Sequence, residues 1–136
     1  MKLLDLVGNT PLIELNKIAL EAGLSIQAKA EFLNPSGSVK DRAARAMILD
    51  GLERGLLRPG KTIIDASSGN TGIAYAMIGA ALGYPVLIYL PANANDERKH
   101  FIRRYGAKIV ETDPLESSDG AFLAAQKEAA AYPEKY

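Results

Sequence analysis

The chain has 136 residues, with 16 basic and 16 acidic side chains and a formal net charge of zero. This is the length of one ordinary domain, and the balanced charge argues against a nucleic-acid-binding protein. The chain has no cysteine and a single histidine, which excludes disulfides and thiolate metal sites and leads us to expect no bound metal.

The first predicted elements are two short strands, over residues 10–15 and 26–32. Between them, residues 16–22 favour a short helix that ends at Gly23. Lys2 is followed by only two leucines before Asp5. Because an export signal needs a longer apolar run, we expect a cytoplasmic protein.

A longer helix is predicted over residues 39–54, after a loop rich in Asn, Pro, Ser and Gly. Gly55 is its expected stop. Apolar residues at helical spacing indicate the face that this helix would bury. That apolar stripe is expected to comprise Val39, Ala43, Met47 and Leu52.

Strands and helices then alternate, with predicted strands starting at residues 62, 84 and 108. This regular alternation is typical of right-handed crossovers in a parallel sheet. We therefore predict an α/β fold with helices on both faces of the sheet. The expected elements are strands over 62–66, 84–90 and 108–111 and helices over 73–82, 96–105 and 119–131.

Local signals also predict helix caps and buried faces. Asn95 is the expected N-cap of the helix over 96–105, and Ser117 or Ser118 that of the last helix. His100 lies among basic residues and is expected to face solvent. The side chains of this helix expected in the core are Phe101, Ile102 and Tyr105.

One uncharged stretch could be mistaken for a membrane span. Residues 66–95 carry no charge, and residues 72–90 are almost wholly apolar. Gly83-Tyr84-Pro85 interrupts the run and leaves a helix and a strand that are each too short to cross a bilayer. We therefore predict a buried helix and a buried strand, and no membrane partner.

Residues 55–62 match the phosphate-binding pattern G-x-x-x-x-G-K-T. That loop must leave a strand and open a helix, so that backbone N–H groups meet the phosphates. Here the segment leaves a helix and enters a strand, and Pro59 lacks an N–H group. We interpret it as a helix–turn–strand connector.

The segment 67–72, Ser-Ser-Gly-Asn-Thr-Gly, has the required context, because it follows a strand at the sheet edge where α/β proteins bind ligands. Unpaired N–H groups at the helix start, with the hydroxyls, suit a small anion such as a carboxylate or phosphate. Gly69 and Gly72 would let a ligand approach the backbone, and the Asn70 amide can donate and accept. Spacing alone leaves an ordinary N-cap equally open.

Lys40 falls in the first turn of a predicted helix, where the helix dipole disfavours an ammonium group. Partial burial there would lower its pKa and make the amine a better nucleophile or base. On position alone, an ordinary surface lysine is the favoured alternative.

Several motifs occur in one order along almost the whole chain: Gly8-Asn9-Thr10-Pro11-Leu12, Asn34-Pro35-Ser36-Gly37-Ser38-Val39-Lys40-Asp41-Arg42, Gly55-Leu56-Leu57-Arg58-Pro59-Gly60, Ser68-Gly69-Asn70-Thr71-Gly72-Ile73, Gly83-Tyr84, Glu97-Arg98 and Tyr105-Gly106-Ala107. In this combination the chain resembles the cysteine synthase (O-acetylserine sulfhydrylase) and cystathionine β-synthase family. These are pyridoxal 5′-phosphate enzymes of fold type II.

The resemblance implies a role for each matching residue. Lys40 corresponds to the lysine that binds the cofactor covalently and later moves the substrate's Cα proton. Asn70 corresponds to the residue that hydrogen-bonds the cofactor's 3′-oxygen. The family usually has Thr at the position of Ser67, and since the hydroxyl is kept we expect carboxylate binding with a slightly looser fit. The loop that would hold the substrate's α-carboxylate comprises Ser67, Ser68, Gly69 and Thr71.

The implied chemistry is β-replacement. An amino-acid substrate, O-acetylserine or a similar activated serine, would exchange its β-substituent for sulfide and give cysteine. Residues 91–96 depart from the usual pattern and are expected to alter the mobile lid of the smaller domain. The alternatives left open are cystathionine β-synthase and other β-replacing or β-eliminating members.

Length is the main departure from the family. Its members are much longer, and their loop for the cofactor phosphate lies later in the sequence. The resemblance therefore implies an N-terminal portion of an enzyme, a homodimer at full length, that has little or no activity alone. Residues 1–37 would be strands that join a larger domain, and residues 38–136 the smaller α/β domain. The other alternative is a non-catalytic fragment or interaction module.

Overall fold

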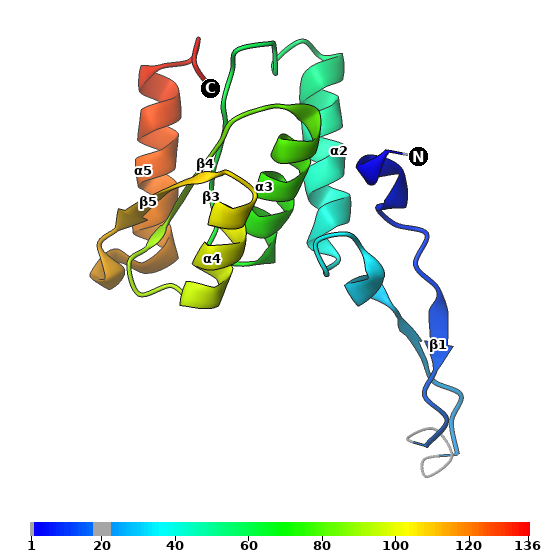
Figure 1. The fold of residues 1–136 in the computed structure, drawn as a ribbon. Coiled ribbons are helices and arrows are strands. Elements are labelled where there is room, and N and C mark those ends of the chain that lie inside the picture. The colour runs from blue at the N-terminus through cyan, green and yellow to red at the C-terminus, as the bar shows by residue number, and fades with distance from the viewer. Residues whose placement is uncertain (1, 18–22) are drawn as a thin grey trace.

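A computed structural model describes residues 2–17 and 23–136. Its main body is a three-stranded parallel sheet with four helices, and an N-terminal hairpin projects from it (Figure 1). Three short 3-10 turns complete the fold, over Leu3–Leu6, Glu31–Leu33 and Pro114–Glu116. The helices and strands are β1 (Leu12–Glu14), β2 (Gln27–Lys29), α2 (Lys40–Glu53), β3 (Ile63–Ala66), α3 (Asn70–Leu82), β4 (Val86–Pro91), α4 (Asp96–Arg104), β5 (Lys108–Thr112) and α5 (Ser117–Ala131).

The sheet has the order β3-β4-β5, and both pairs of neighbours are parallel. In this register Ile63 lies opposite Val86, and Leu87 lies opposite Lys108. β4 is the central strand and is buried along nearly all of its length. This explains why it shows no alternation of polar and apolar residues, and it confirms the predicted parallel α/β fold.

Helices cover both faces of the sheet. α3 and α4 pack on one face, and α2 packs on α3, while α5 covers the opposite face of β3 and β4 (Figure 1). On the α5 face, Tyr89 packs against Ala121 and Ala125. The larger core lies on the α3 face and includes Ile78, Ile88 and Ile102, all fully buried.

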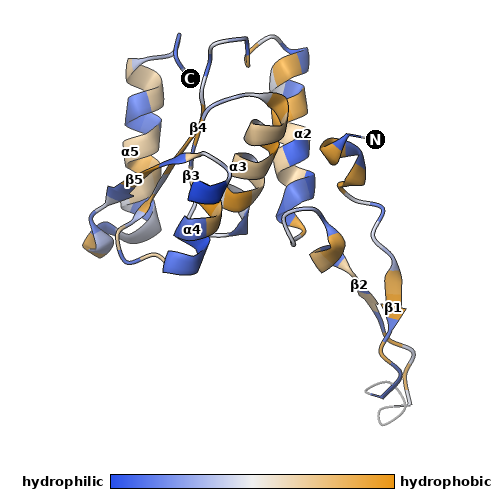
Figure 2. Ribbon diagram, in the orientation of Figure 1, coloured by the Kyte–Doolittle hydropathy of each residue, from blue (hydrophilic) through white to orange (hydrophobic). Residues whose placement is uncertain are grey.

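α3 is the buried helix expected from the uncharged stretch, and β4 is the buried strand that follows it. All residues of α3 from Gly72 to Gly79 are buried, and Figure 2 shows the apolar character of this region. Within the described residues, no helix has both the length and the apolar character needed to cross a membrane. The interruption lies where it was predicted, because Gly83 ends α3 in a left-handed conformation with φ 77°.

Two helix starts differ from the prediction. α3 begins at Asn70 and not at residue 73, so three residues of the predicted loop form its first turn. α5 begins at Ser117 with no side-chain cap, so the predicted cap by Ser117 or Ser118 is wrong. The reason is that a 3-10 turn leads directly into α5, and Asp113 caps that turn by accepting from Leu115 N.

The predicted apolar face of α2 is wrong at three of its four positions, and only Leu52 packs against the core. Val39 and Met47 are about half exposed, and Ala43 faces solvent. The buried positions are Asp41, Ala44 and Ile48, because that is the face that packs on α3. Because one of the buried positions is an aspartate, a search for apolar residues at helical spacing does not identify the buried face of α2.

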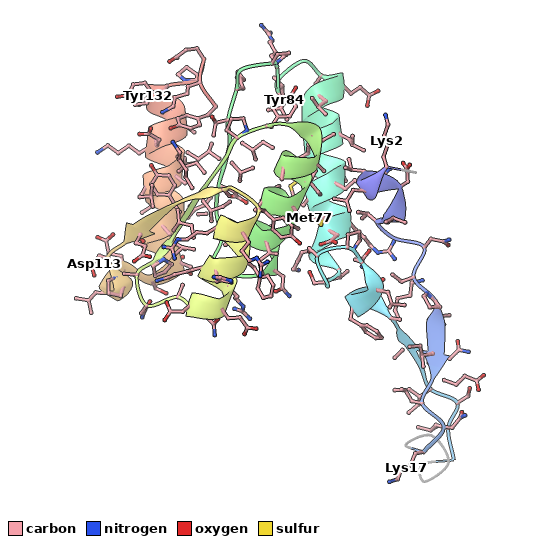
Figure 3. The ribbon with its side chains drawn as sticks, in the orientation of Figure 1. Lys2, Lys17, Met77, Tyr84, Asp113 and Tyr132 are labelled. Atoms are coloured by element: carbon pink, nitrogen blue, oxygen red, sulfur yellow. The ribbon has the colours of Figure 1, made fainter. Side chains whose placement is uncertain are left out.

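The N-terminal segment forms an antiparallel hairpin in which Leu12 pairs with Lys29. β1 and β2 are shorter than the predicted strands and form no hydrogen bonds with the parallel sheet. Figure 3 shows Lys17 at the far end of this hairpin, remote from Met77 in the packed body. Most of the helix predicted over residues 16–22 lies outside the described residues.

Candidate active site

The starts of α2, α3 and α4 lie at the same end of the molecule, where β3 and β4 end (Figure 1). This arrangement follows from the parallel topology, in which each strand is followed by a helix that runs back. It brings Lys40, the first residue of α2, to the same edge as the 67–72 loop. The edge is therefore the candidate site.

The loop between β3 and α3 is closed by the hydroxyl of Ser67. Ser67 Oγ accepts hydrogen bonds from Gly69 N at 3.3 Å and Gly72 N at 3.0 Å, and Ser67 N donates to Tyr89 O on the central strand. A hydroxyl accepts two hydrogen bonds and donates one. Its acceptor capacity is thus used within the loop, and its proton remains available to a ligand.

Three backbone N–H groups in the same loop have no acceptor within the described residues. They belong to Ser68, Asn70 and Thr71. The first turn of a helix always leaves such groups, and α3 has no side-chain cap to satisfy them. Together with the positive end of the α3 dipole, they form a site suited to a carboxylate or phosphate.

The two glycines of the loop have different functions. A side chain at Gly69 would meet no atom within 4 Å, so the backbone there is open on that side. A Cβ at Gly72 would lie 2.9 Å from Ser67 O and 3.3 Å from Ile102 Cδ1. Gly72 is therefore required for internal packing, and its predicted part in admitting a ligand stays a prediction.

Lys40 is exposed at the start of α2, as expected for a surface lysine, and is not partly buried in this chain. Its backbone N donates to Ser38 Oγ at 3.2 Å. An exposed amine at the edge that also carries free N–H groups is free to react with a carbonyl group of a bound molecule.

Asp41 holds the loop that precedes Lys40. Its side chain is fully buried, accepts from Ser36 N at 2.7 Å and forms a second hydrogen bond with Ser36 Oγ. A buried carboxylate is tolerated only when it is well hydrogen-bonded. The sequence motif contains Asp41 but gives it no role, and its position directly after Lys40 is the signal that could have indicated one.

A cleft of about 450 Å³ opens beside this edge. It is lined by the 34–37 loop, by Asn70 and Ile73 of α3, and by Arg98 and Phe101 of α4. Asn70 is the predicted site residue that lines it, whereas Lys40 and Ser67 do not.

Phe101 is 43% exposed, so its predicted place in the core is wrong: α4 directs Ile102 inward and leaves Phe101 at the cleft. The exposed position predicted for His100 is confirmed.

The loop between β4 and α4, at the same edge, is held by Lys99. This side chain is 5% exposed, donates to Ala92 O at 2.6 Å and pairs with Glu111 Oε1 at 3.2 Å. Asn95 caps α4 as predicted, with its Oδ1 accepting from Arg98 N at 3.1 Å. Nothing in the run of basic residues distinguished Lys99 as the buried one.

These features define a class of protein. The chain belongs to the family of pyridoxal-phosphate dependent enzymes, whose sequence profile matches residues 3–136. The chain is 55% identical, over 98% of its length, to a cysteine synthase of Aquifex aeolicus, and 50% identical, over 85% of its length, to a cystathionine beta-synthase of Apis mellifera. It spans only 42% and 23% of those two proteins.

Solved structures agree with this assignment. Cysteine synthase (OASS) from Entamoeba histolytica matches with a TM-score of 0.93 and 35% identity over 99% of the chain, which is 41% of that protein. An O-ureido-L-serine synthase matches with a TM-score of 0.92 and 42% identity over 96% of the chain, again 41% of that protein. The predicted fold class is thereby confirmed.

The residues present fit a pyridoxal phosphate cofactor in the part of the site that this chain supplies. Its aldehyde requires an accessible amine, and Lys40 is exposed at the edge. Its amino-acid substrates carry a carboxylate, and three N–H groups without acceptors lie in the adjoining loop. The Asn70 residue lines the neighbouring cleft, and its amide can both donate and accept a hydrogen bond.

Proposed function

We propose that this chain is the N-terminal part of a cysteine synthase, which exchanges the β-substituent of O-acetylserine, or of a similar activated serine, for sulfide. The observation that carries the proposal is the loop at the start of α3, with free N–H groups of Ser68, Asn70 and Thr71. Its identity to a cysteine synthase over nearly its whole length supports the same conclusion.

In this proposal the loop binds the substrate. The free N–H groups and the hydroxyls of Ser67, Ser68 and Thr71 donate to the α-carboxylate, and Gly69 leaves room for it. The Ser67 proton is the one donor that its internal hydrogen bonds leave unused. Holding the carboxylate orients the Cα–H bond and excludes water from the edge.

The Lys40 amine acts twice in the proposed reaction. It would hold the cofactor, and once released from it the same amine would remove the substrate's Cα proton as a general base. The Asn70 amide would donate to the cofactor's 3′-oxygen, a substituent of the ring, and would help to orient the ring. Pyridoxal phosphate, when bound, supplies an electron sink for the negative charge at Cα. We place the loop for its phosphate outside residues 1–136, and we propose that residues 1–37 join a larger domain.

Reductive trapping tests this role of Lys40. The intact protein is incubated with pyridoxal 5′-phosphate, reduced with borohydride and digested, and we expect a pyridoxyl adduct on Lys40 by mass mapping. Lys40→Arg should remove the adduct and leave other lysines unchanged. An adduct confined to other lysines would disprove the assignment. We expect the 136-residue chain by itself to show little or no β-replacement activity.

The loop has its own test. Ser68→Ala should weaken binding of O-acetylserine to the intact protein. Ser118→Ala is the matched control, because Ser118 is an exposed serine at the start of α5, away from the site. Equal affinities in the two variants would contradict carboxylate binding at this loop.

A second candidate is cystathionine β-synthase activity, which the 50% identity to the Apis mellifera protein favours. The two reactions differ in the nucleophile, so rates of the intact protein with homocysteine and with sulfide distinguish them. A third candidate, a non-catalytic interaction module, predicts neither cofactor absorbance nor turnover. Cytoplasmic location and a homodimer stay predictions, and light scattering of the full-length protein tests the dimer.

A further inference from the structure

The Glu31 carboxylate lies at the centre of a hydrogen-bonded cluster that the proposed function does not use. Arg42 donates to both of its oxygens, from Nε at 2.9 Å and from Nη2 at 2.8 Å. Thr10 Oγ1 donates to it at 2.7 Å and Asn34 Nδ2 at 2.8 Å. These donors, Arg42 above all, lower the pKa of Glu31 to about 2. The carboxylate is therefore ionised near neutral pH.

The cluster joins segments that are distant in the sequence. Thr10 and Asn34 are buried, at 6% and 3% exposure. Asn34 Oδ1 accepts from Gly8 N at 2.8 Å, and Arg42 Nη2 also donates to Thr10 Oγ1 at 3.1 Å. The turn before β1, the 34–38 loop and the first turn of α2 thus meet at the Glu31 carboxylate.

Lys40 lies beside two anchored residues of α2. Val39, which precedes it, provides no side-chain cap, and locally Ser38 Oγ accepts from Lys40 N at 3.2 Å. In addition, Asp41 is bound to Ser36, and Arg42 is bound to the Glu31 cluster. Successive helical residues point about 100° apart. Fixing positions 41 and 42 therefore fixes the direction in which the Lys40 side chain leaves the helix.

We propose that Glu31 is a positioning residue for the Lys40 amine and acts through its two-point pair with Arg42. The inference rests on the proposed function, which assigns the reactive amine to Lys40. The geometry depends on the planar guanidinium, which binds both carboxylate oxygens; a lysine at position 42 would keep the charge but lose the second contact. Arg42→Lys therefore separates positioning from a simple effect of charge.

The first test observes the orientation of Lys40 without any cofactor. The lysines of the 136-residue chain are dimethylated with isotope-labelled formaldehyde and observed by NMR, with the signal of Lys40 assigned from Lys40→Arg. We expect a Lys40 resonance distinct from that of exposed Lys127. It should move to the Lys127 position in Glu31→Gln and in Arg42→Lys. Asp50→Asn is the matched control, because Asp50 lies on the same helix as Lys40 and the substitution removes an exposed ion pair with Arg54, the C-cap residue. It should leave the resonance in place.

Two results would overturn the proposal. The first is that the Lys40 resonance coincides with the Lys127 resonance in the wild-type chain. The second is that the Lys40 resonance of the folded Arg42→Lys variant keeps its wild-type position. If Glu31→Gln does not fold, Thr10→Val removes a single donor to the same carboxylate and takes its place in the test.

Trapping with pyridoxal 5′-phosphate and borohydride gives the second readout. Relative to Lys127, adduct formation at Lys40 of the intact protein should fall about tenfold in Glu31→Gln and in Arg42→Lys, as expected for the loss of a charge-assisted contact. An unchanged ratio in both variants would overturn the proposal. If wild-type Lys40 forms no adduct, the proposed function fails, and the NMR result alone decides whether Glu31 positions Lys40.

Discussion

Gly79 of α3 lies where the helix comes closest to the strand that follows it. A Cβ at this position would overlap Val86 Cγ2 and lie 3.0 Å from the carbonyl oxygen of Tyr84. Neither neighbour can yield easily, because Val86 is 4% exposed within β4 and the carbonyl belongs to the backbone. Gly79→Ala is therefore a direct test of how α3 packs on the sheet.

Two opposing effects determine whether Gly79→Ala raises or lowers the free energy of unfolding. Alanine in a helix interior is favoured over glycine by about 1 kcal/mol, while overpacking a well-filled core costs about 1–3 kcal/mol or more. Because the overlap with Val86 is severe, the overpacking cost belongs in the upper part of this range, and we expect Gly79→Ala to lower the free energy of unfolding by about 1–2 kcal/mol. Gly51, inside α2, is the matched control: its Cβ would lie 3.6 Å from Leu57 Cβ, an ordinary contact. Gly51→Ala should raise the free energy of unfolding by about 0.5–1 kcal/mol.

Urea unfolding of the 136-residue chain, followed by circular dichroism, measures both variants against the wild type. The two substitutions are chemically identical and both lie in helices, so helix propensity cancels in the comparison. If Gly79→Ala lowers the free energy of unfolding and Gly51→Ala raises it, the result supports the close packing of α3 on β4. A Gly79→Ala variant as stable as Gly51→Ala would refute it, because the methyl group would then have room that the structure excludes.

Two further predictions concern single side chains. Asn95→Ala should lower the free energy of unfolding by about 1 kcal/mol, and Asn95→Gly by only a few tenths, because Asn95 Oδ1 caps Arg98 N; equal losses in urea unfolding would contradict a capping role. Burial, with a smaller contribution from the Asp65 carboxylate, raises the pKa of Tyr75 from 10.0 to about 12. Because the folded state keeps this phenol protonated, Tyr75 contributes to the free energy of unfolding in full below pH 10, and the contribution is lost as the pH rises towards 12. Tyr75→Phe should reduce this alkaline loss, measured by urea unfolding across that range; an unchanged pH dependence would show that Tyr75 keeps an ordinary pKa when folded.

The order of elements could be predicted from local signals. The uncharged run with its Gly83-Tyr84-Pro85 interruption indicated a buried helix followed by a buried strand, and α3 and β4 are found there. The regular alternation of helices and strands predicted the parallel sheet. The free N–H groups at the start of α3 follow from the polar segment 67–72. These features depend on neighbours in the sequence, so a linear pattern contains them.

The errors occurred where packing decides which side of an element is buried. Asp41 was not expected in the buried face of α2, and it is buried because Ser36 satisfies its carboxylate. Phe101 was expected in the core, yet it lines the cleft. Lys99 could not be distinguished from the basic residues around it, because its acceptors, Ala92 O and Glu111, come from other elements.

Short motifs and the polarity of consecutive residues encode the family of this protein, the lysine proposed to react and the loop proposed to bind the substrate. What holds that lysine and loop in place depends on packing between distant segments. The Glu31 carboxylate meets Thr10, Asn34 and Arg42 across separations of up to 21 residues. Such contacts form only when the hairpin, the loop and α2 pack together, and no local pattern of charge or hydropathy specifies that packing.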